Sequence, residues 1–159
     1  MTAPQIARSL FSPYGQLAEE VCQDCLKEEC KYIAVHGGQL YPGVEELLKT
    51  LKPSRGLYIV SNCQDGYIQC FLEYTGFGKY ICGYECSGVT GLSKAENIRL
   101  LAGRSGLRSP VYVGDTAMDE ESAAGAGVPF IHAAYGFGRA LSLAAVIHRP
   151  LELLNIIEV

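Results

Sequence analysis

Short, uninterrupted apolar runs recur along this chain, and segments with the spacing of amphipathic helices separate them. The runs are Leu57–Val60, Tyr80–Cys82, Val111–Val113 and Val128–Ile131. A run without a polar position is typical of a strand that is buried on both faces of a sheet. Because such strands alternate with helices, we expect an α/β fold: a parallel sheet between layers of helices, in a three-layer, Rossmann-like arrangement.

The expected helices occupy the segments between the apolar runs. They cover residues 15–31, the segment between Pro42 and Pro53, and residues 67–76, 93–101, 119–126 and 139–147. In the segment before Pro53, apolar residues recur at i, i+3, i+4 and i+7, which places them on one helical face. A length of 159 residues suits one globular domain of this kind.

The composition argues against several classes of protein. With 48% hydrophobic residues, the chain can bury enough apolar surface to offset the entropy of folding, so we do not expect disorder. No stretch approaches the roughly 20 apolar residues of a membrane span. A net charge of −4 argues against nucleic-acid binding. The first ten residues lack the apolar core of a secretory signal, and seven cysteines cannot all pair, so we expect a reduced, cytoplasmic protein.

Polar residues follow the first apolar run, where an open parallel sheet binds its ligands. Ser61 and Asn62 come directly after this expected strand. Either residue could simply cap the next helix, because Ser and Asn are favoured at helix N-termini. Alternatively, the Ser61 hydroxyl and the backbone N–H of Asn62 could bind a phosphate oxygen.

Lys94 lies in the first turn of an expected helix. Ser93 and Glu96 have the spacing of a capping box with Ser93 as the N-cap. The helix dipole disfavours a cation in that turn by about 0.3–1 kcal/mol. An anion or a carboxylate in front of Lys94 would account for its position, and a solvated lysine is the alternative.

Two aspartates stand near the end of the third apolar run. Asp115 follows the expected strand, and Asp119 begins the next helix four residues later. Both carboxylates could face one point above the sheet edge and hold Mg²⁺, which prefers hard oxygen ligands. The alternative is that Asp119 only complements the positive end of the helix dipole, which leaves Asp115 less well explained.

These motifs occur in an order that is typical of one enzyme superfamily. Along the chain they are Ser61-Asn62, Lys94 and Gly114-Asp115-xxx-Asp119. This order resembles the haloacid dehalogenase (HAD) superfamily, especially its phosphoglycolate-phosphatase-like members, and the resemblance runs from about residue 40 to the C-terminus.

The resemblance implies a role for each of these residues. Ser61, Asn62 and Lys94 would bind the phosphoryl group of a small phosphorylated metabolite, with Ser61 and Lys94 taking part in catalysis. Asp115 and, less closely matched, Asp119 would hold Mg²⁺. Each motif is short, and their order and spacing together carry the resemblance.

One motif of the superfamily is missing from this sequence. The Asp-x-Asp-x-Thr motif, which ends an N-terminal strand and supplies the nucleophile, is not found, because the aspartates stand at positions 24, 65, 115 and 119. Residues 1–36 resemble the end of the helical cap that such phosphatases insert after that strand. We therefore expect a helical cap remnant over residues 1–36 and an α/β core over residues 37–159.

The missing strand would be the central one of the superfamily's sheet. Buried backbone N–H and C=O groups need partners. We therefore expect the strands at Leu57–Val60 and Val111–Val113 to pair directly and close the pocket. Alternatively, they accept a strand from the N-terminal segment or from another chain, through a homo-oligomer or strand exchange.

The sequence thus predicts a Mg²⁺-dependent, phosphatase-type hydrolase of small phosphate monoesters with incomplete or impaired activity. Formation of a phosphoaspartate needs a positioned carboxylate nucleophile, which the missing motif would supply. The alternative is a non-catalytic HAD-like domain that binds phosphate or metal, or that acts as an interaction module. A response-regulator receiver fits less well, because its paired acids follow the first strand.

Overall fold

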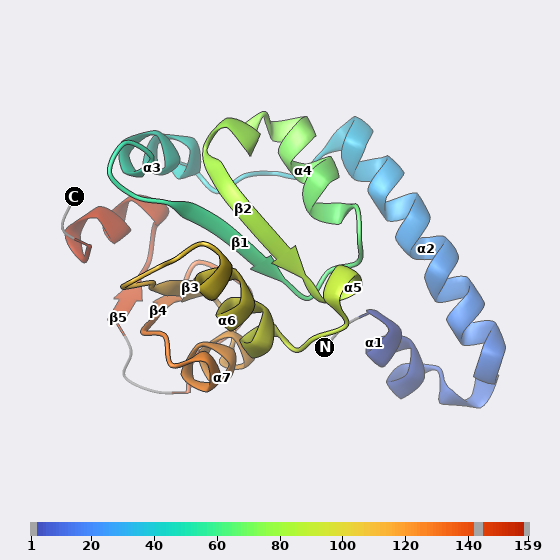
Figure 1. Ribbon diagram of the computed structural model, residues 1–159. Coiled ribbons are helices and arrows are strands. Elements are labelled where there is room, and N and C mark those ends of the chain that lie inside the picture. Colours follow the sequence, from blue (N-terminus) through green and yellow to red (C-terminus); the bar gives the residue numbers. More distant parts are fainter. Residues whose placement is uncertain (1–2, 142–144, 158–159) are drawn as a thin grey trace.

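The computed structural model describes residues 3–141 and 145–157. Helices and parallel strands alternate along the chain, which confirms the α/β class (Figure 1). The helices are α1 (Ala3–Leu10), α2 (Gly15–His36), α3 (Val44–Leu51), α4 (Tyr67–Thr75), α5 (Ser87–Thr90), α6 (Lys94–Arg104) and α7 (Ala117–Ala126). The strands are β1 (Leu57–Ser61), β2 (Ile81–Cys86), β3 (Tyr112–Gly114), β4 (Phe130–Ala133) and β5 (Ala145–Ile147). Single-turn 3-10 helices cover Ser12–Tyr14 and Phe77–Lys79, and a longer one covers Pro150–Asn155.

The strands form two sheets instead of one. In the first sheet β1 pairs with β2, and in the second the order is β3, β4, β5, with all pairs parallel. Within the described residues, no backbone hydrogen bond joins β1 to β3. The expectation that these two strands pair directly is therefore wrong. A side chain bridges the two strands instead: the Tyr112 hydroxyl donates to the carbonyl oxygen of Val60 at 3.3 Å.

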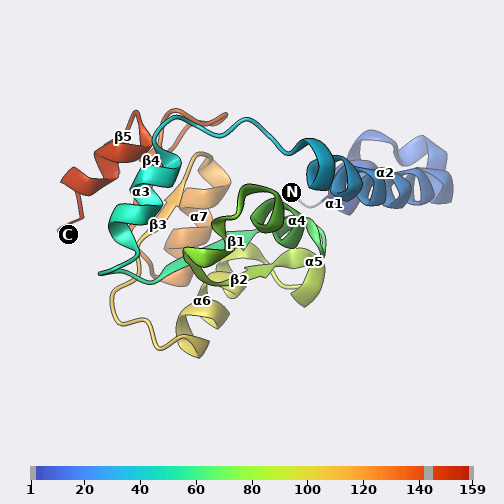
Figure 2. The same cartoon turned by 90° about the horizontal axis from the view of Figure 1, so that it is seen from above.

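The N-terminal segment does not supply a strand either. Its described part is helical from residue 3 to residue 36, apart from the connection around the 3-10 turn. Helix α2 packs against α1 and α4 and extends away from the strands (Figures 1 and 2). Strand donation from this segment is therefore wrong, because helical backbone satisfies its hydrogen bonds internally. A strand from another chain stays a prediction, as does the division of the chain at residue 36.

The expected last helix is also wrong where the structure describes it. Residues 145–147 form strand β5, which pairs with β4 in parallel, and residues 142–144 lie outside the described residues. Val146 is 43% exposed and Ile147 only 1%. Pairing with β4 defines the strand, and β-branched residues such as Val and Ile favour a pleated, half-buried surface.

The main apolar cluster joins the second sheet to α3. Its buried members are Leu47, Leu51, Ile131, Ala133, Ile147 and Leu153. Leu57, at the start of β1, packs against the same cluster from the first sheet. Helix α6 contacts β1 and β2, α7 contacts β3 and β4, and the two helices pack against each other. The two sheets therefore share one body although their strands do not pair.

Within residues 3–141 and 145–157, no helix is long and apolar enough to cross a bilayer. All seven cysteines are free thiols in the structure.

Candidate functional site

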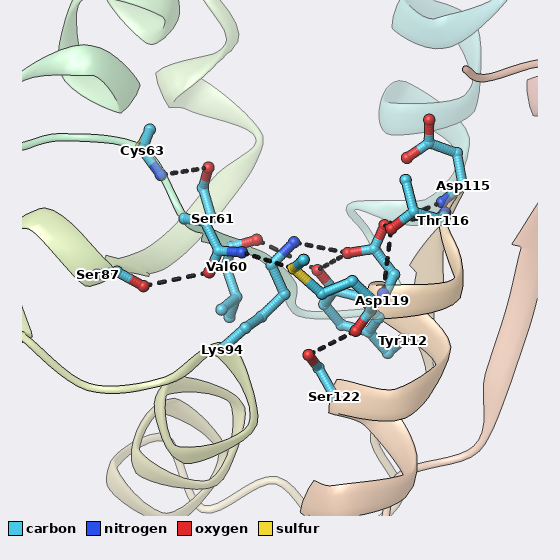
Figure 3. Close-up of polar contacts among 12 residues, drawn as sticks. Val60, Ser61, Cys63, Ser87, Lys94, Tyr112, Asp115, Thr116, Asp119 and Ser122 are labelled. Carbon is cyan, nitrogen blue, oxygen red and sulfur yellow. Dashed lines mark hydrogen bonds and ion pairs between the residues drawn. The ribbon is translucent and has the colours of Figure 1, made fainter. Parts of the chain in front are cut away.

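The polar residues predicted from the sequence lie at the carboxyl ends of the strands (Figure 3). Ser61 ends β1, and Lys94 begins α6. Asp115 follows β3 directly, and Asp119 lies in the first turn of α7. Two different sheets thus bring their loops to one edge of the molecule.

Lys94 and Asp119 form a buried ion pair at this edge. The Lys94 Nζ donates to Asp119 Oδ1 at 2.6 Å, and the side chains are only 14% and 7% exposed. The capping box of Ser93 and Glu96 is present and places Lys94 in the first turn of α6. The carboxylate that was expected to account for Lys94 is therefore that of Asp119.

The second oxygen of Asp119 is held by Thr116 and the backbone. Thr116 Oγ1 donates to Asp119 Oδ2 at 2.7 Å, and the backbone N–H groups of Asp115 and Thr116 point to the same oxygen at 3.3 and 3.1 Å. Thr116 is the N-cap of α7, and Asp119 completes its capping box. Asp119 therefore stabilises the start of α7, as one interpretation of the sequence expected, and it also pairs with Lys94.

These contacts set the ionisation of Asp119. Burial by itself raises the pKa of this carboxyl group, but the hydrogen bonds and charge of Lys94, together with Thr116, outweigh it and leave the pKa below its usual value. Burial and the neighbouring Asp119 charge raise the pKa of Tyr112. Asp119 is therefore an anion and Tyr112 a neutral hydrogen-bond donor at neutral pH.

The lowered pKa of Asp119 predicts how stability changes in acid. A carboxyl group whose pKa is lower in the folded state stabilises the protein above its unfolded pKa, about 3.9 for aspartate, and loses this contribution as pH falls through the folded value. We expect the difference in unfolding free energy between wild type and Asp119→Asn to be constant at pH 5–7 and to shrink below about pH 4. Denaturant unfolding at several pH values measures it, and a difference unchanged down to pH 2.5 would contradict the prediction.

Asp115 faces a different neighbour from Asp119. Its Oδ2 accepts a hydrogen bond from the backbone N–H of Phe137 at 2.8 Å, whereas both Asp119 oxygens point to Lys94 and Thr116. In Figure 3 the Asp115 carboxylate lies on the far side of Thr116 from Lys94. No group of three His, Cys, Asp or Glu side chains suited to a metal ion occurs among the described residues. Asp115 thus offers one carboxylate to a cation, and a site for Mg²⁺ would need oxygens from elsewhere.

Ser61 and Asn62 are held by neighbours of the first sheet. Ser61 Oγ accepts from the backbone N–H of Cys63 at 3.2 Å. The Asn62 side chain accepts from Ser87 Oγ at 3.2 Å and donates to the sulfur of Met118 at 3.4 Å. The Ser61 hydroxyl also hydrogen-bonds the side chain of Cys63. The contact of Asn62 with Met118 links the loop after β1 to the start of α7.

A cavity of about 1080 Å³ opens beside this edge. Asn62, Lys94 and Met118 line it from the core, and α1 and α2 close it with residues such as Arg8 and Leu26. Ser61, Asp115 and Asp119 do not line it. The structure therefore brings Asn62 and Lys94 to a ligand-sized space, with Asp119 behind Lys94.

Two glycines allow the aspartates to approach the backbone. A Cβ at Gly114 would lie 2.5 Å from the Cβ of Asp119, and one at Gly136 would lie 2.3 Å from the Cβ of Asp115. No real side chain tolerates contacts this short. Gly136 belongs to the turn after β4 whose next residue, Phe137, donates to Asp115.

The sequence analysis missed Tyr112 and Thr116 as site residues. Thr116 could have been found, because Thr followed three residues later by an acidic residue is a helix-start pattern. Tyr112 carries no such signal, since its position between the two strands depends on tertiary structure. Burial raises the pKa of the nearby Cys63 thiol to about 11, which makes this thiol a poor nucleophile at neutral pH.

The sequence of this chain matches the model of one known protein family. The model of the haloacid dehalogenase-like hydrolase family matches residues 4–127, which is most of the chain. The chain belongs to this family. No curated protein sequence matches it.

Solved structures of HAD proteins are similar to this HAD-like chain. A HAD-superfamily hydrolase, subfamily IA, from Geobacter sulfurreducens shares 26% identity with a TM-score of 0.63, covering 74% of this chain and 61% of its own. A structure titled as a predicted phosphoglycolate phosphatase from Haemophilus somnus shares 25% identity with a TM-score of 0.65, covering 77% and 59%. This chain therefore spans about three fifths of the length of these two proteins.

A further structure is similar in fold alone. It is titled as a predicted phosphatase from Clostridium acetobutylicum, with 23% identity and a TM-score of 0.74, and the match covers 96% of this HAD-like chain and 77% of that protein.

Proposed function

We propose that this chain binds the phosphate group of a small phosphorylated metabolite, together with Mg²⁺, and that its hydrolysis of phosphate monoesters is impaired. The observation that carries the proposal is the buried Lys94 ammonium, which Asp119 holds at the wall of the cavity. An ammonium group has three N–H donors, and the bond to Asp119 uses one. Asn62 lines the same cavity, and Ser61 precedes it at the end of β1, so we assign both to the phosphate site.

Asp115 is the residue that would hold the metal ion. Mg²⁺ commonly binds one or two carboxylates together with substrate phosphates and keeps several waters, so one available carboxylate is sufficient when phosphate is present. When bound, the ion would neutralise and orient the phosphate. Asp119 is assigned to positioning Lys94, because its two oxygens already accept hydrogen bonds from Lys94 and Thr116.

Impaired turnover is supported by the placement of the four aspartates. Transfer of a phosphoryl group to a side chain needs a carboxylate that can reach phosphorus. Asp115 and Asp119 are engaged as described, Asp24 is exposed and paired with Lys27 on α2, and Asp65 is exposed on the rim of the cavity. The alternative function, a domain that binds phosphate without turnover, follows from the same observation.

Thermal unfolding with inorganic phosphate and Mg²⁺ tests the proposal. We expect the two ligands together to raise the Tm of the wild-type chain more than either alone. At ten times Kd the gain is about 1.4 kcal/mol, or roughly 3–6 °C for a chain of this size. Asp115→Asn should abolish the part that depends on Mg²⁺. Asp65→Asn, an aspartate on the rim of the same cavity, is the matched control and should leave it unchanged.

Hydrolysis of a generic phosphate monoester by the same variants completes the test. We expect little or no turnover by the chain alone. Turnover that needs Mg²⁺ and is lost in Asp115→Asn would support the site and contradict the impairment. Equal loss of the Mg²⁺ effect in Asp65→Asn and Asp115→Asn, or no stabilisation by phosphate at all, would contradict the site.

A further inference from the structure

Two thiol groups from different helices lie in contact where α2 meets α4. The side chain of Cys70, on α4, hydrogen-bonds that of Cys30, on α2. The two helices pack against each other, as Figure 1 shows. Both cysteines are partly exposed, so small molecules in solution can reach this pair.

Contacts at the start of α4 also place the Cys30 sulfur. The Gln64 side-chain amide donates to Cys30 Sγ at 3.8 Å, and a Cβ at Gly66 would lie 4.0 Å from that sulfur. Gly66 is the N-cap of α4, and the Cys70 N–H donates to its carbonyl oxygen at 3.0 Å. Cys70 thus lies one turn beyond Gly66 on the same helical face. Cys30 therefore faces the turn of α4 that carries Cys70.

Two other pairs of cysteines are poorer candidates for a disulfide. Cys63 and Cys86 also hydrogen-bond, but Cys86 is only 2% exposed, and buried thiols are inert. Cys22 and Cys25 stand three residues apart inside α2. Their Cβ atoms are therefore about 5–6 Å apart, whereas a disulfide needs about 3.5–4.5 Å. The geometry favours the pair of Cys30 and Cys70.

Helix α2 is held to the rest of the molecule by a narrow stripe. One face carries its partly buried residues, and all its other residues are exposed. The stripe consists of Ala18, Cys22, Leu26, Cys30 and Ile33. A helix with so little buried surface opens locally at a low free-energy cost. A covalent bond from this stripe to α4 would therefore restrict α2 strongly.

The stripe also forms part of the cavity wall. Leu26 and Cys30 line the cavity from α2, and Asn62 and Lys94 line it from the core. Gln64, which contacts Cys30, lies in the loop that carries Asn62. A bond between α2 and α4 would therefore act on the cavity that contains the candidate site.

We propose that Cys30 and Cys70 form a reversible disulfide, which fixes the α2 wall of the cavity against α4. Two thiols that already hydrogen-bond need only small side-chain movements to reach bonding distance. In a reducing compartment such a bond would be transient and would report an oxidising change. The proposal goes beyond phosphate binding and does not require it.

A small disulfide such as oxidised glutathione supplies the oxidising equivalents. One protein thiolate attacks a sulfur of that molecule, forms a mixed disulfide and expels one glutathione thiolate. The second protein thiolate attacks the protein sulfur of the mixed disulfide and expels the other glutathione. Two protein thiols thus lose two electrons and two protons, and one small disulfide becomes two thiols. Burial and the neighbouring Cys30 thiol raise the pKa of Cys70, so we expect faster reaction at about pH 8.5 than at pH 7.

Peptide mapping of the full chain after treatment with oxidised glutathione tests the pairing. Trypsin, together with a protease that cleaves before aspartate, places Cys30 on residues 28–31 and Cys70 on residues 65–79, each without another cysteine. We expect mass spectrometry without reductant to find these two peptides joined, two hydrogen atoms lighter than the free peptides together. Dithiothreitol should release them.

Thermal unfolding and hydrogen exchange measure what the bond does. In the unfolded chain the crosslink closes a loop of about 40 residues, so we expect oxidation to raise Tm by roughly 5–15 °C. We also expect slower exchange over residues 15–36. Cys70→Ser should lose both effects. Cys25→Ser removes an exposed thiol of the same helix and is the matched control, which should keep them.

Several results would overturn the proposal. Glutathione retained on both Cys30 and Cys70 would show that the two sulfurs do not approach each other. A map dominated by Cys63 joined to Cys86, or a covalent dimer as the main product, would assign the oxidation elsewhere. Equal loss of the Tm gain in Cys25→Ser and Cys70→Ser would do the same. All these measurements are made without phosphate or Mg²⁺, so a negative outcome leaves the proposed function untouched.

Discussion

Replacing Lys94 by methionine is expected to destabilise the protein by roughly 3 kcal/mol, a fall in Tm of about 6–12 °C. The substitution keeps an unbranched side chain of similar length but removes the charge. It leaves the Asp119 carboxylate, whose side chain is 7% exposed, without its cation. An uncompensated buried charge is among the most costly single changes in a folded protein. Denaturant unfolding of wild type and variant measures the difference.

A double variant separates the charge from the packing. Adding Asp119→Asn to Lys94→Met removes both charges, and we expect the pair to be less destabilised than the sum of the two single changes by about 1–3 kcal/mol. Lys27→Met is the matched surface control. Lys27 pairs with Asp24 at 3.1 Å, but the two side chains are 69% and 76% exposed, so the loss should stay below about 1 kcal/mol. A loss for Lys94→Met no larger than that control would show that the buried pair contributes little.

Replacing Ile147 by alanine is expected to cost about 2–5 kcal/mol of unfolding free energy. Ile147 is 1% exposed and belongs to the cluster that joins the second sheet to α3. The loss comprises the transfer free energy of the removed methyl and methylene groups and the cavity that they leave. Denaturant unfolding measures it, with the slope of the transition checked against wild type.

Its neighbour in the same strand is the control. Val146 is 43% exposed, so Val146→Ala should change the unfolding free energy by no more than about 0.5 kcal/mol. This contrast between adjacent residues follows from the burial of Ile147 in the cluster and the exposure of Val146. Similar losses for the two variants would contradict that placement of the two side chains.

Local patterns were sufficient for most of the secondary structure. The strand at Leu57 and the helix that begins after Ser93 were predicted close to their observed bounds, because a continuous apolar run and a capping box are contained within a few residues. The end of α4 at Gly76 has the same basis: Gly76 adopts a left-handed backbone conformation that caps the helix. Strand β5 was predicted as a helix, because a run of three residues is too short to show its period and gains its regularity from pairing with β4.

The candidate site was predictable by residue but not by partner. The unfavourable position of Lys94 in a first turn indicated that an anion faces it, and this anion is Asp119, from a different helix. The carboxylates of Asp115 and Asp119 were expected to face one cation. The sequence did not show that they hydrogen-bond to different partners. Local capping bonds to Thr116 orient Asp119, whereas Asp115 is oriented by the Phe137 amide, from a turn 22 residues further along the chain.

The sequence by itself determined the α/β class, the order of the elements and the family's motifs, because these depend on hydrophobic period, helix caps and the residue types at strand ends. Tertiary structure alone decided that the strands divide into two sheets, that Tyr112 bridges them and that the Lys94 charge is buried against Asp119. The physical reason is that strand pairing and ion pairing join residues far apart in the chain. Their free energy depends on which backbone edges and charges are brought together, and no local pattern records that.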